Sequence, residues 1–269
     1  MLFMKKLITH VRPHLDDICG MWLLKKYVPA FRTAGLSFVS ATMKDPGDPN
    51  RVFVGLGRRR FDEHKGDIGE SAASLVWIFV RPKVKDRVTR AALDRLVLWV
   101  RDEDRGMHDL EPNQELLPTT QIRAYFDRHG RNSATLASFG FELLEGMYSS
   151  FENSVRLDQA WKKRKEFRTR WGRGVALKTA ASDVDQYSYK KGAVLLVLHD
   201  TRAGFRHYRA SAKSRVNLTS TYRLLREIDP RADWYLHHSK KLLLSGSDVA
   251  PDTSISKLPL RRLIDLVRA

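Results

Sequence analysis

The chain has 269 residues, of which 42% are hydrophobic, and is long enough for one large domain or two smaller ones with separate cores. No apolar run reaches the ~18–20 residues needed to cross a bilayer, so we expect a soluble protein with no membrane partner. The net charge of +17 favours a polyanionic partner, above all nucleic acid. The alternative is a basic surface without chemistry, because charge favours association and does not specify a reaction.

The cysteine content points to a reducing compartment. A single cysteine, Cys19, cannot form an internal disulfide, which fits the cytoplasm. Cys19 falls among Ile18, Met21 and Trp22, where a buried thiol is usually inert. We therefore expect a cytoplasmic protein and no cysteine nucleophile.

Predicted strands alternate with predicted helices near the N-terminus. A short strand at Leu7-Ile8 precedes a helix whose apolar stripe runs from Ile18 to Tyr27, with carboxylates in its first turn. Strands are predicted over residues 36–40 and 51–55, and a helix over 71–79. This alternation predicts an α/β domain with a mostly parallel sheet, whose ligands bind at the carboxyl ends of the strands.

The rest of the chain is predicted to be helical at first and then richer in strands. A basic helix from residue 152 to about residue 170 follows three helical segments, and strands are then expected around a helix at 218–228. The helical segments are 85–100, around 122–126 and 136–147; the strands are 174–177, 193–199, 205–210 and a hairpin of 234–238 with 241–244; a short helix is expected within 258–267. We divide the chain into a parallel-sheet domain (residues 1–150), a basic connector helix (151–173) and a smaller α+β C-terminal domain (174–269).

Three polar clusters follow predicted strand or helix ends. They are the histidines and carboxylates of residues 9–17, the run 62–64 and the acidic run 102–104. In the first cluster, His10, His14 and Asp16 offer a mixed nitrogen and oxygen donor set that suits Mn, Zn or Fe more than Ca or Mg. Histidines near aspartates are also often hydrogen-bonded loop residues without a metal. An α/β sheet can bring all three clusters to one edge, which would build a two-metal phosphoester site.

Five segments carry a family resemblance. They are Thr-His-x-x-x-His-x-Asp-Asp at 9–17, Val-Phe-Val-Gly at 52–55, Arg-Phe-Asp-Glu-His at 60–64, Ser-Ala-Ala-Ser-Leu-Val-Trp at 71–77 and Asp-Glu-Asp-Arg-Gly at 102–106. In this order they resemble the DHH phosphoesterase superfamily, and most closely its melanocyte-proliferating-gene exonuclease branch. The resemblance is clear over roughly the first 110 residues. It implies a DHH-like domain, a substrate-binding C-terminal domain, a cleft between them, and hydrolysis of phosphodiesters with manganese, or magnesium in its place, as one or two ions.

The resemblance also assigns roles to single residues. His10, His14, Asp16 and Asp104 match metal ligands, and Glu63 stands where the family has a ligand histidine. The resemblance places His64 against a substrate phosphate.

Two neighbouring carboxylates and one departure complete the predicted site. We expect Asp17 and Asp62 to orient histidines and water within the catalytic group. The family's metal-bridging aspartate is matched by Phe53, which cannot bind a metal; Asp45 or Asp48 from the preceding loop could substitute for it. A single-metal site or a catalytically inactive relative is therefore an alternative.

The C-terminal part supplies the predicted contacts to substrate. The candidate residues are Arg206, His207, Arg209, His237, His238 and Lys240. Interleaved Tyr208, Trp234 and Tyr235 would stack on bases of a single strand, unless they belong to the core. If that hairpin is regular, His237 and His238 point to opposite sides, because a strand alternates faces, and at most one of them should face a ligand.

Two functions follow from the sequence. The first is a metal-dependent phosphodiester hydrolase, a nuclease acting on RNA or single-stranded DNA through a metal-activated water; a 3′-5′ polarity would follow from the resemblance alone. The second is a non-catalytic nucleic-acid-binding protein with a degenerate DHH site. A small-phosphate hydrolase fits the broadly basic composition less well. The sequence does not indicate the oligomeric state.

Overall fold

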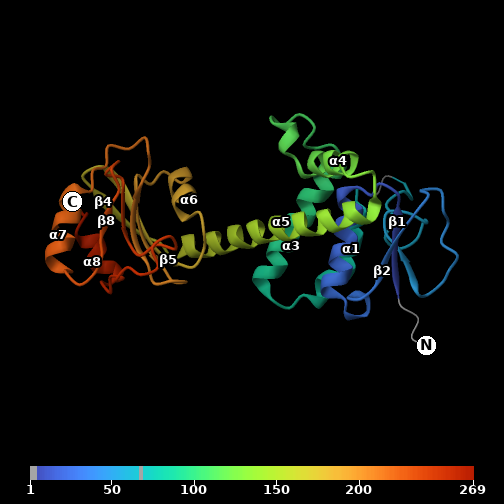
Figure 1. Cartoon of the computed structure of the whole chain (residues 1–269), viewed down its shortest axis with the longest axis horizontal. Coiled ribbons are helices and arrows are strands. Elements are labelled where there is room, and N and C mark those ends of the chain that lie inside the picture. The colour runs from blue at the N-terminus through green and yellow to red at the C-terminus, as the bar shows by residue number, and fades with distance from the viewer. Residues whose placement is uncertain (1–4, 67–68) are drawn as a thin grey trace. The chain divides into compact units, whose positions relative to one another are not determined.

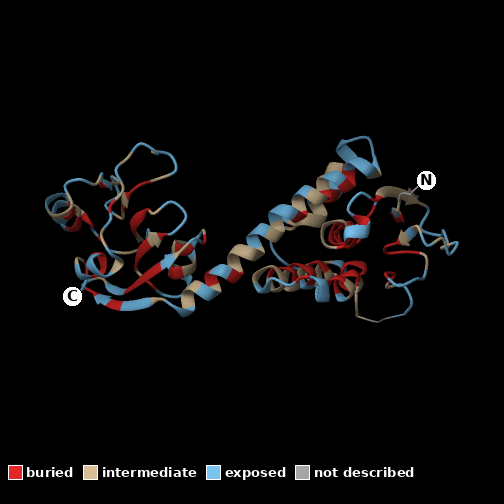
Figure 2. Cartoon of the chain, turned by 90° about the horizontal axis from the view of Figure 1, so that it is seen from below, coloured by how far each residue is buried: buried red, intermediate tan, exposed pale blue. Residues whose placement is uncertain are grey.

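The protein is described by a computed structural model over residues 5–66 and 69–269, and it divides into two compact units, Met1–Glu152 and Asn153–Ala269. Both units are mixtures of helices and strands, and each has its own sheet and its own buried residues (Figures 1 and 2).

The first unit contains a three-stranded parallel sheet. Its central strand is β1 (Lys6–His10), with β2 (Gly35–Val39) on one side and β3 (Arg51–Phe53) on the other. Parallel neighbours need a crossover connection, and α1 (Leu15–Tyr27) supplies it between β1 and β2. The parallel sheet predicted for this part of the chain is therefore confirmed. Because the strands run in one direction, their carboxyl ends share one edge of the sheet.

Helices supply most of the core of the first unit. α1 packs against α2 (Ala72–Val80) and α3 (Arg87–Asp104) around buried Leu, Ile, Val and Trp side chains. α2 begins where the Ser71 hydroxyl accepts the Ser74 N–H, and α3 begins where Asp86 accepts the Thr89 N–H at 2.7 Å. Short 3-10 turns, α4 (Pro118–Arg128) and the first part of α5 (Ser133–Lys162) complete the unit. The turns are η1 (Pro29–Phe31), η2 (Arg81–Lys83) and η3 (Gln114–Leu116).

The second unit is built on a six-stranded mixed sheet of order β4-β5-β6-β7-β9-β8. Its strands are β4 (Lys165–Thr169), β5 (Gly172–Thr179), β6 (Leu195–Asp200), β7 (Arg206–Ala210), β8 (Tyr235–Leu236) and β9 (Leu242–Ser245). β5 and β6 are parallel and the other pairs are antiparallel. The helices are α6 (Val184–Lys190), α7 (Thr219–Ile228) and α8 (Leu260–Asp265).

The prediction of a basic connector helix over residues 151–173 is wrong. α5 is one continuous helix that starts at Ser133 and ends at Lys162, and the residues that follow form β4. From Glu166 to Thr169, exposed and buried residues of β4 alternate, with Phe167 and Thr169 buried, which is the period of a strand and not of a helix. A tight turn then leads into β5 at Gly172, whose φ of +126° disfavours other residues. The short, polar α6 was not predicted.

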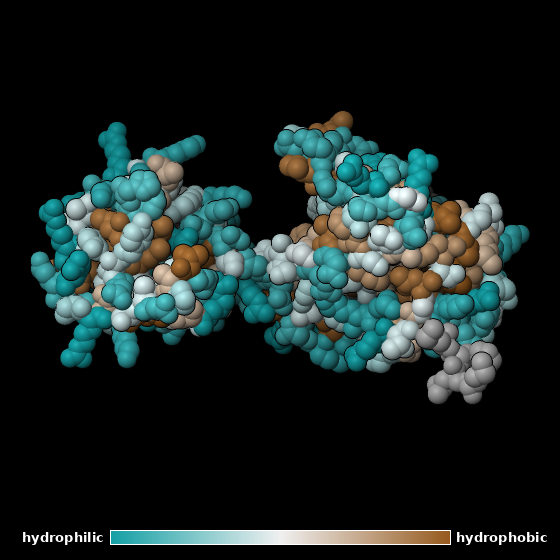
Figure 3. All heavy atoms as spheres, in the orientation of Figure 1, coloured by the Kyte–Doolittle hydropathy of each residue, from teal (hydrophilic) through white to brown (hydrophobic). Residues whose placement is uncertain are grey.

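The surface agrees with the charged composition. Hydrophilic side chains predominate at the outer margins of each unit on the face shown in Figure 3. Within the described ranges, none of the helices is both long and apolar enough to pass through a membrane.

Candidate metal centre

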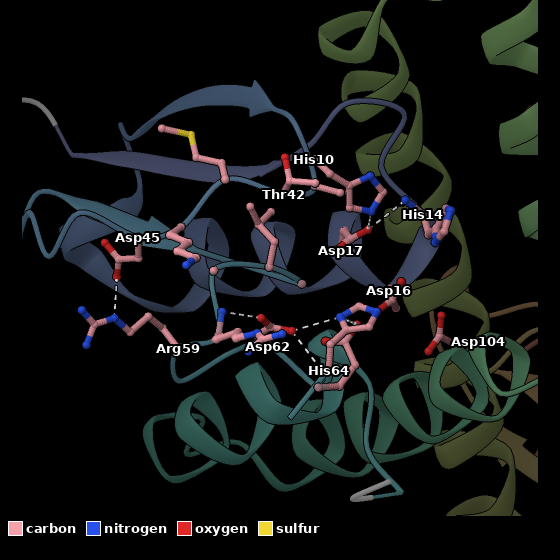
Figure 4. A pocket seen from close by; sticks show the side chains of 18 residues that line it. His10, His14, Asp16, Asp17, Thr42, Asp45, Arg59, Asp62, His64 and Asp104 are labelled. Carbon is pink, nitrogen blue, oxygen red and sulfur yellow. Dashed lines mark hydrogen bonds and ion pairs between the residues drawn. The ribbon is translucent and has the colours of Figure 1, made fainter. Parts of the chain in front are cut away.

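The three polar clusters meet in the first unit, at the carboxyl edge of the parallel sheet (Figure 4). His10 ends β1, His14 precedes α1, the run 62–64 follows β3 and Asp104 ends α3. Together they line a cavity of about 1160 Å³. The expectation that an α/β sheet brings these clusters to one edge is confirmed.

The sequence at the start of α1 explains how the first cluster is held. His14 has extended backbone (φ −81°, ψ 173°) and precedes the first helical residue, Leu15. The Asp17 carboxylate accepts the backbone N–H of His14 at 2.9 Å, so an acidic side chain of the first turn caps the helix. Asp16 and Asp17 are therefore fixed relative to the end of β1.

His10 and Asp17 form a closely coupled pair. The Nδ1–H of His10 donates to the Val11 carbonyl at 2.8 Å, because a carbonyl can only accept. The opposite nitrogen, Nε2, lies 2.9 Å from Asp17 Oδ2. The hydrogen bond to Asp17 raises the pKa of His10 to about 9 despite partial burial. A histidine anchored at Nδ1 by a carbonyl presents Nε2 in a fixed direction, as metal-binding histidines do.

Asp16, His14 and Asp104 form a group whose members come from distant parts of the sequence. One ligand atom from each lies within 4.8 Å of the other two, although α3 ends almost ninety residues after α1 begins. Asp16 is 3% exposed and accepts the N–H of Ala72, at the N-terminus of α2, at 3.2 Å. Burial, followed by the nearby charges of Asp17 and Asp104, raises the pKa of Asp16. Burial and the charge of Asp17 likewise raise the pKa of Asp104.

Asp62 holds the third cluster together. Its buried carboxylate accepts the backbone N–H groups of Arg58 and His64, and it lies 3.0 Å from His64 Nδ1. Burial alone would raise the pKa of Asp62, but these hydrogen bonds hold it below its usual range. This is the orienting contact expected of Asp62. The His64 side chain is 71% exposed and therefore accessible from the cavity.

Glu63 has one carboxylate oxygen that is not hydrogen-bonded to any described residue. Its Oε2 is buried and has no hydrogen-bond partner among the residues that the structure describes. Burial raises the pKa of Glu63 to about 7, with further contributions from Asp17 and Asp104. A buried carboxylate oxygen without a partner is costly, and a bound cation would satisfy it.

The donor set therefore fits a divalent cation. Three groups of ligand atoms are present in the described part of the chain, and the first two share His14: His10, His14 and Asp17; His14, Asp16 and Asp104; and Asp62, Glu63 and His64. They combine imidazole nitrogens with carboxylate oxygens, and their buried acids repel one another unless a cation neutralises them.

Phe53 lies outside this donor set. It is 3% exposed and packs with Ile8 and Leu56 in a small apolar cluster, and it does not line the cavity. Of the two aspartates proposed as substitutes, Asp45 lines the cavity and pairs with Arg59 at 3.2 Å. Asp48 pairs with Arg51 at 3.2 Å and is not among the lining residues.

Gly55 is a site residue that the sequence analysis did not recognise. It lies two residues beyond the end of β3, with φ of +70°, and a Cβ atom there would be 1.7 Å from Asp17 Oδ1. The Asp17 carboxylate thus occupies the space directly over the end of β3, where any other residue would place its side chain. The available signal was a glycine directly after a strand, which often marks a close approach.

Basic residues also line the cavity. They are Lys44 from the loop after β2 and Arg58 and Arg59 from the loop after β3. No role was predicted from the sequence for these three residues. These side chains give the cavity a cationic side beside its acidic cluster.

For two of the predicted substrate contacts in the second unit, the prediction is wrong. Arg206 and His207 are 8% and 6% exposed, because both faces of the sheet at β7 are covered. The Arg206 guanidinium donates to backbone carbonyls, including that of Leu258 at 3.1 Å, and His207 Nε2 lies 3.2 Å from the Gly246 carbonyl. Both side chains therefore make hydrogen bonds inside the second unit and do not face a ligand. Arg209 pairs with Asp185 at 3.2 Å.

The remaining candidates of the second unit lie in the turn between β8 and β9. β8 ends at Leu236, so strand alternation does not apply to His237 and His238, whose rings are 3.9 Å apart. Opposite orientation was expected only for a regular strand through residue 238, and β8 ends two residues earlier. His238 and Lys240 are exposed and remain available to a ligand.

The aromatic residues of this unit separate into core and surface. Tyr208 and Trp234 are buried, and the Tyr208 hydroxyl donates to the Leu263 carbonyl at 2.9 Å. Tyr235 is 57% exposed and lines a cavity of about 600 Å³. Of the three aromatics considered for stacking, Tyr235 alone has an accessible ring.

No protein-family model matches this sequence, and no curated protein matches it.

Proposed function

We propose that the first unit is a divergent DHH-type phosphoesterase that hydrolyses phosphodiester bonds of RNA or single-stranded DNA with a bound divalent cation. The observation that carries this proposal is the meeting of His14, Asp16 and Asp104 ligand atoms within 4.8 Å in a large cavity. Nitrogen and carboxylate donors suit manganese, with magnesium as the alternative, as one or two ions.

The residues of the chain have distinct parts in the proposed reaction. His10, His14, Asp16, Glu63 and Asp104 would hold the cation. When bound, a divalent cation supplies Lewis-acid polarisation of a phosphate oxygen and acidifies water. Asp17 lies 2.9 Å from His10 Nε2, the nitrogen that would bind the cation, so the proton shared there would be lost when the cation binds, and Asp17 would keep the ring in place from beside it. Asp62 fixes the direction of His64. The exposed His64 ring would donate a hydrogen bond to a phosphate oxygen.

The chemical balance of the reaction is that of ordinary hydrolysis. One water adds its oxygen to phosphorus as the phosphorus–oxygen bond to the leaving nucleoside breaks. One proton of that water ends on the leaving alkoxide and the other is released. No covalent enzyme intermediate is required, and Cys19 is fully buried and outside the cavity.

Charge favours nucleic acid over a small phosphate as the substrate. The chain carries a net charge of +17, and the cavity of about 1160 Å³ is lined by lysine and arginine as well as by acids. A long polyanion gains from a broadly basic surface, whereas a small anion gains only from a local pocket.

A second function is favoured by Phe53. This residue stands where the family has a metal-bridging aspartate and packs into an apolar cluster. A site without that bridge would bind nucleic acid and not cleave it. Binding without turnover, with affinity falling steeply as salt rises, is the expected behaviour in that case.

The test is cleavage of end-labelled single-stranded RNA and DNA by chelator-treated protein, with and without added Mn²⁺. His14→Ala and Asp16→Ala should each lower the metal-dependent rate by about 100-fold or more. Mn²⁺ affinity, measured by calorimetry on the same samples, should fall with the rate. Asp127→Asn on α4 is the matched control, because Asp127 pairs with Arg131. Asp127 does not line the cavity and does not belong to the acidic cluster.

The outcomes separate the hypotheses. Cleavage that survives both substitutions would remove these residues from the active site. Tight Mn²⁺ binding without cleavage of either nucleic acid would favour the non-catalytic alternative.

A further inference from the structure

The acidic cluster separates two cavities of the first unit. The larger, of about 1160 Å³, opens toward the loops that follow β2 and β3. A second cavity, of about 460 Å³, lies among α3, α4 and the residues that precede α1. His14, Asp16 and Asp104 line both cavities, so a ligand held by them can extend into either one.

Each cavity has cations of its own. Lys44 and Arg58 line the larger cavity, and Arg12 and Arg123 line the smaller one. Arg59, which also lines the larger cavity, forms an ion pair with Asp45. The other four cations, Lys44, Arg58, Arg12 and Arg123, form no ion pair with any residue in the ranges 5–66 and 69–269. They are therefore available to an anionic ligand on both sides of the cluster.

Two of the arginines are fixed in position by their backbone. Arg12 has φ of +56° and its N–H donates to the Ser133 hydroxyl at 3.0 Å. Arg58 has φ of +54° and its N–H donates to the buried carboxylate of Asp62. Non-glycine residues adopt this left-handed backbone at a cost and keep it where surrounding contacts enforce it. Both arginines thus start from rigid turns beside the cluster.

The smaller cavity also offers a hydrogen-bond acceptor. Glu103 lines it, and the buried Oε2 of Glu103 has no hydrogen-bond partner in the described part of the chain. Its other oxygen accepts the Thr119 N–H at 3.2 Å. Sugar hydroxyls and base N–H groups are the nucleic-acid donors that such an oxygen accepts.

We propose that a single nucleic-acid strand crosses the cluster, with the phosphate to be cleaved at His14, Asp16 and Asp104 and a neighbouring phosphate held in each cavity. Lys44 and Arg58 hold the neighbour on one side, and Arg12 and Arg123 hold the neighbour on the other. This inference rests on the proposed hydrolase function and names its substrate class: strands with phosphates on both sides of the cleaved bond, in preference to isolated diesters.

The experiment compares two substrates that differ in flanking phosphates. One is a labelled oligonucleotide of single-stranded RNA, and the other is bis(4-nitrophenyl) phosphate, which has one phosphate only. Arg12→Gln and Arg58→Gln should each lower kcat/KM on the oligonucleotide by about tenfold more than on the simple diester, mainly through KM. Arg131→Gln is the matched control, because Arg131 also has left-handed backbone (φ +56°) and lines neither cavity.

Oligonucleotides lacking one flanking phosphate assign each arginine to a side. Removal of the phosphate that would lie in the larger cavity should abolish the effect of Arg58→Gln on kcat/KM. Removal of the phosphate that would lie in the smaller cavity should abolish the effect of Arg12→Gln. If wild type cleaves both substrates but the two variants behave like Arg131→Gln, the two-sided path is wrong and the hydrolase function stands. Equal losses on both substrates would also overturn it. If wild type cleaves neither substrate, the hydrolase function itself fails.

Discussion

Replacement of Gly55 by alanine tests whether Asp17 is held across the end of β3. A Cβ atom at residue 55 would lie 1.7 Å from Asp17 Oδ1 and 3.0 Å from its Cγ, which no real contact permits. Asp17 would have to move and lose its contacts with His10 Nε2 and the His14 N–H, both at 2.9 Å. Gly55→Ala should therefore destabilise the first unit and disorder the cluster together.

The magnitude follows from two contributions. A non-glycine residue at φ of +70° costs roughly 1–2 kcal/mol. Displacing a buried carboxylate from its hydrogen bonds costs roughly another 2–3 kcal/mol. We expect Gly55→Ala to lower the free energy of unfolding by roughly 3–5 kcal/mol. Gly130→Ala is the control, since Gly130 has φ of +67° and a Cβ there meets nothing within 4 Å, so only the backbone cost of roughly 1–2 kcal/mol applies.

The assay is urea-induced unfolding of the full chain, followed by far-UV circular dichroism and combined in a double-mutant cycle with Asp17→Ala. Once Asp17 is removed, Gly55→Ala should cost no more than Gly130→Ala, because the clashing carboxylate is gone. The reasoning is refuted if Gly55→Ala costs no more than Gly130→Ala in the wild-type background. It is equally refuted if the full cost persists without Asp17.

Three further predictions concern other parts of the chain. Burial, followed by the charge of Arg209, lowers the pKa of His207 to about 4, so its contribution to stability is present above pH ~6.5 and is lost as the pH falls toward 4. The free energy of unfolding should fall by roughly 3 kcal/mol over this pH range in the wild type, and this fall should disappear in His207→Gln. The same dependence of the free energy of unfolding on pH in the variant would contradict the prediction. Tyr235→Ala should weaken single-strand binding by roughly 1–3 kcal/mol per stacked base in fluorescence anisotropy, and an unaltered Kd would exclude stacking there. Burial raises the pKa of the Cys19 thiol, so a thiol reagent should label Cys19 only after denaturation; rapid labelling of native protein would show that the thiol is accessible.

Local patterns were sufficient to predict most of the elements. The helices α3 and α7 have strong amphipathic periodicity and β1 is a short apolar run, and each lies within a few residues of its expected place. The segment after α5 was predicted wrongly because its run of lysines and arginines hides the two-residue alternation of β4. The buried residues of β4 become recognisable only through pairing with β5, which is a non-local property.

The site was partly predictable for a different reason. Carboxyl ends of parallel strands share an edge, so His10 and the run 62–64 could be placed together from topology. The orientation of β7 was not predictable, because Arg206 and His207 occupy a strand covered on both faces, and a basic sequence gives no sign of such burial. The second cavity was also hidden, since it depends on how α4 packs near Arg12.

The geometry at the end of β3 separates Phe53 from the acidic cluster. Phe53 turns into an apolar pocket with Ile8, and the residue two positions later is a glycine that leaves the strand end open. Asp17 enters that opening from α1 and brings a carboxylate oxygen to the place that the side chain of residue 55 would otherwise fill. The negative charge at this strand end is therefore supplied from α1, and the position of the Asp17 carboxylate depends on Gly55.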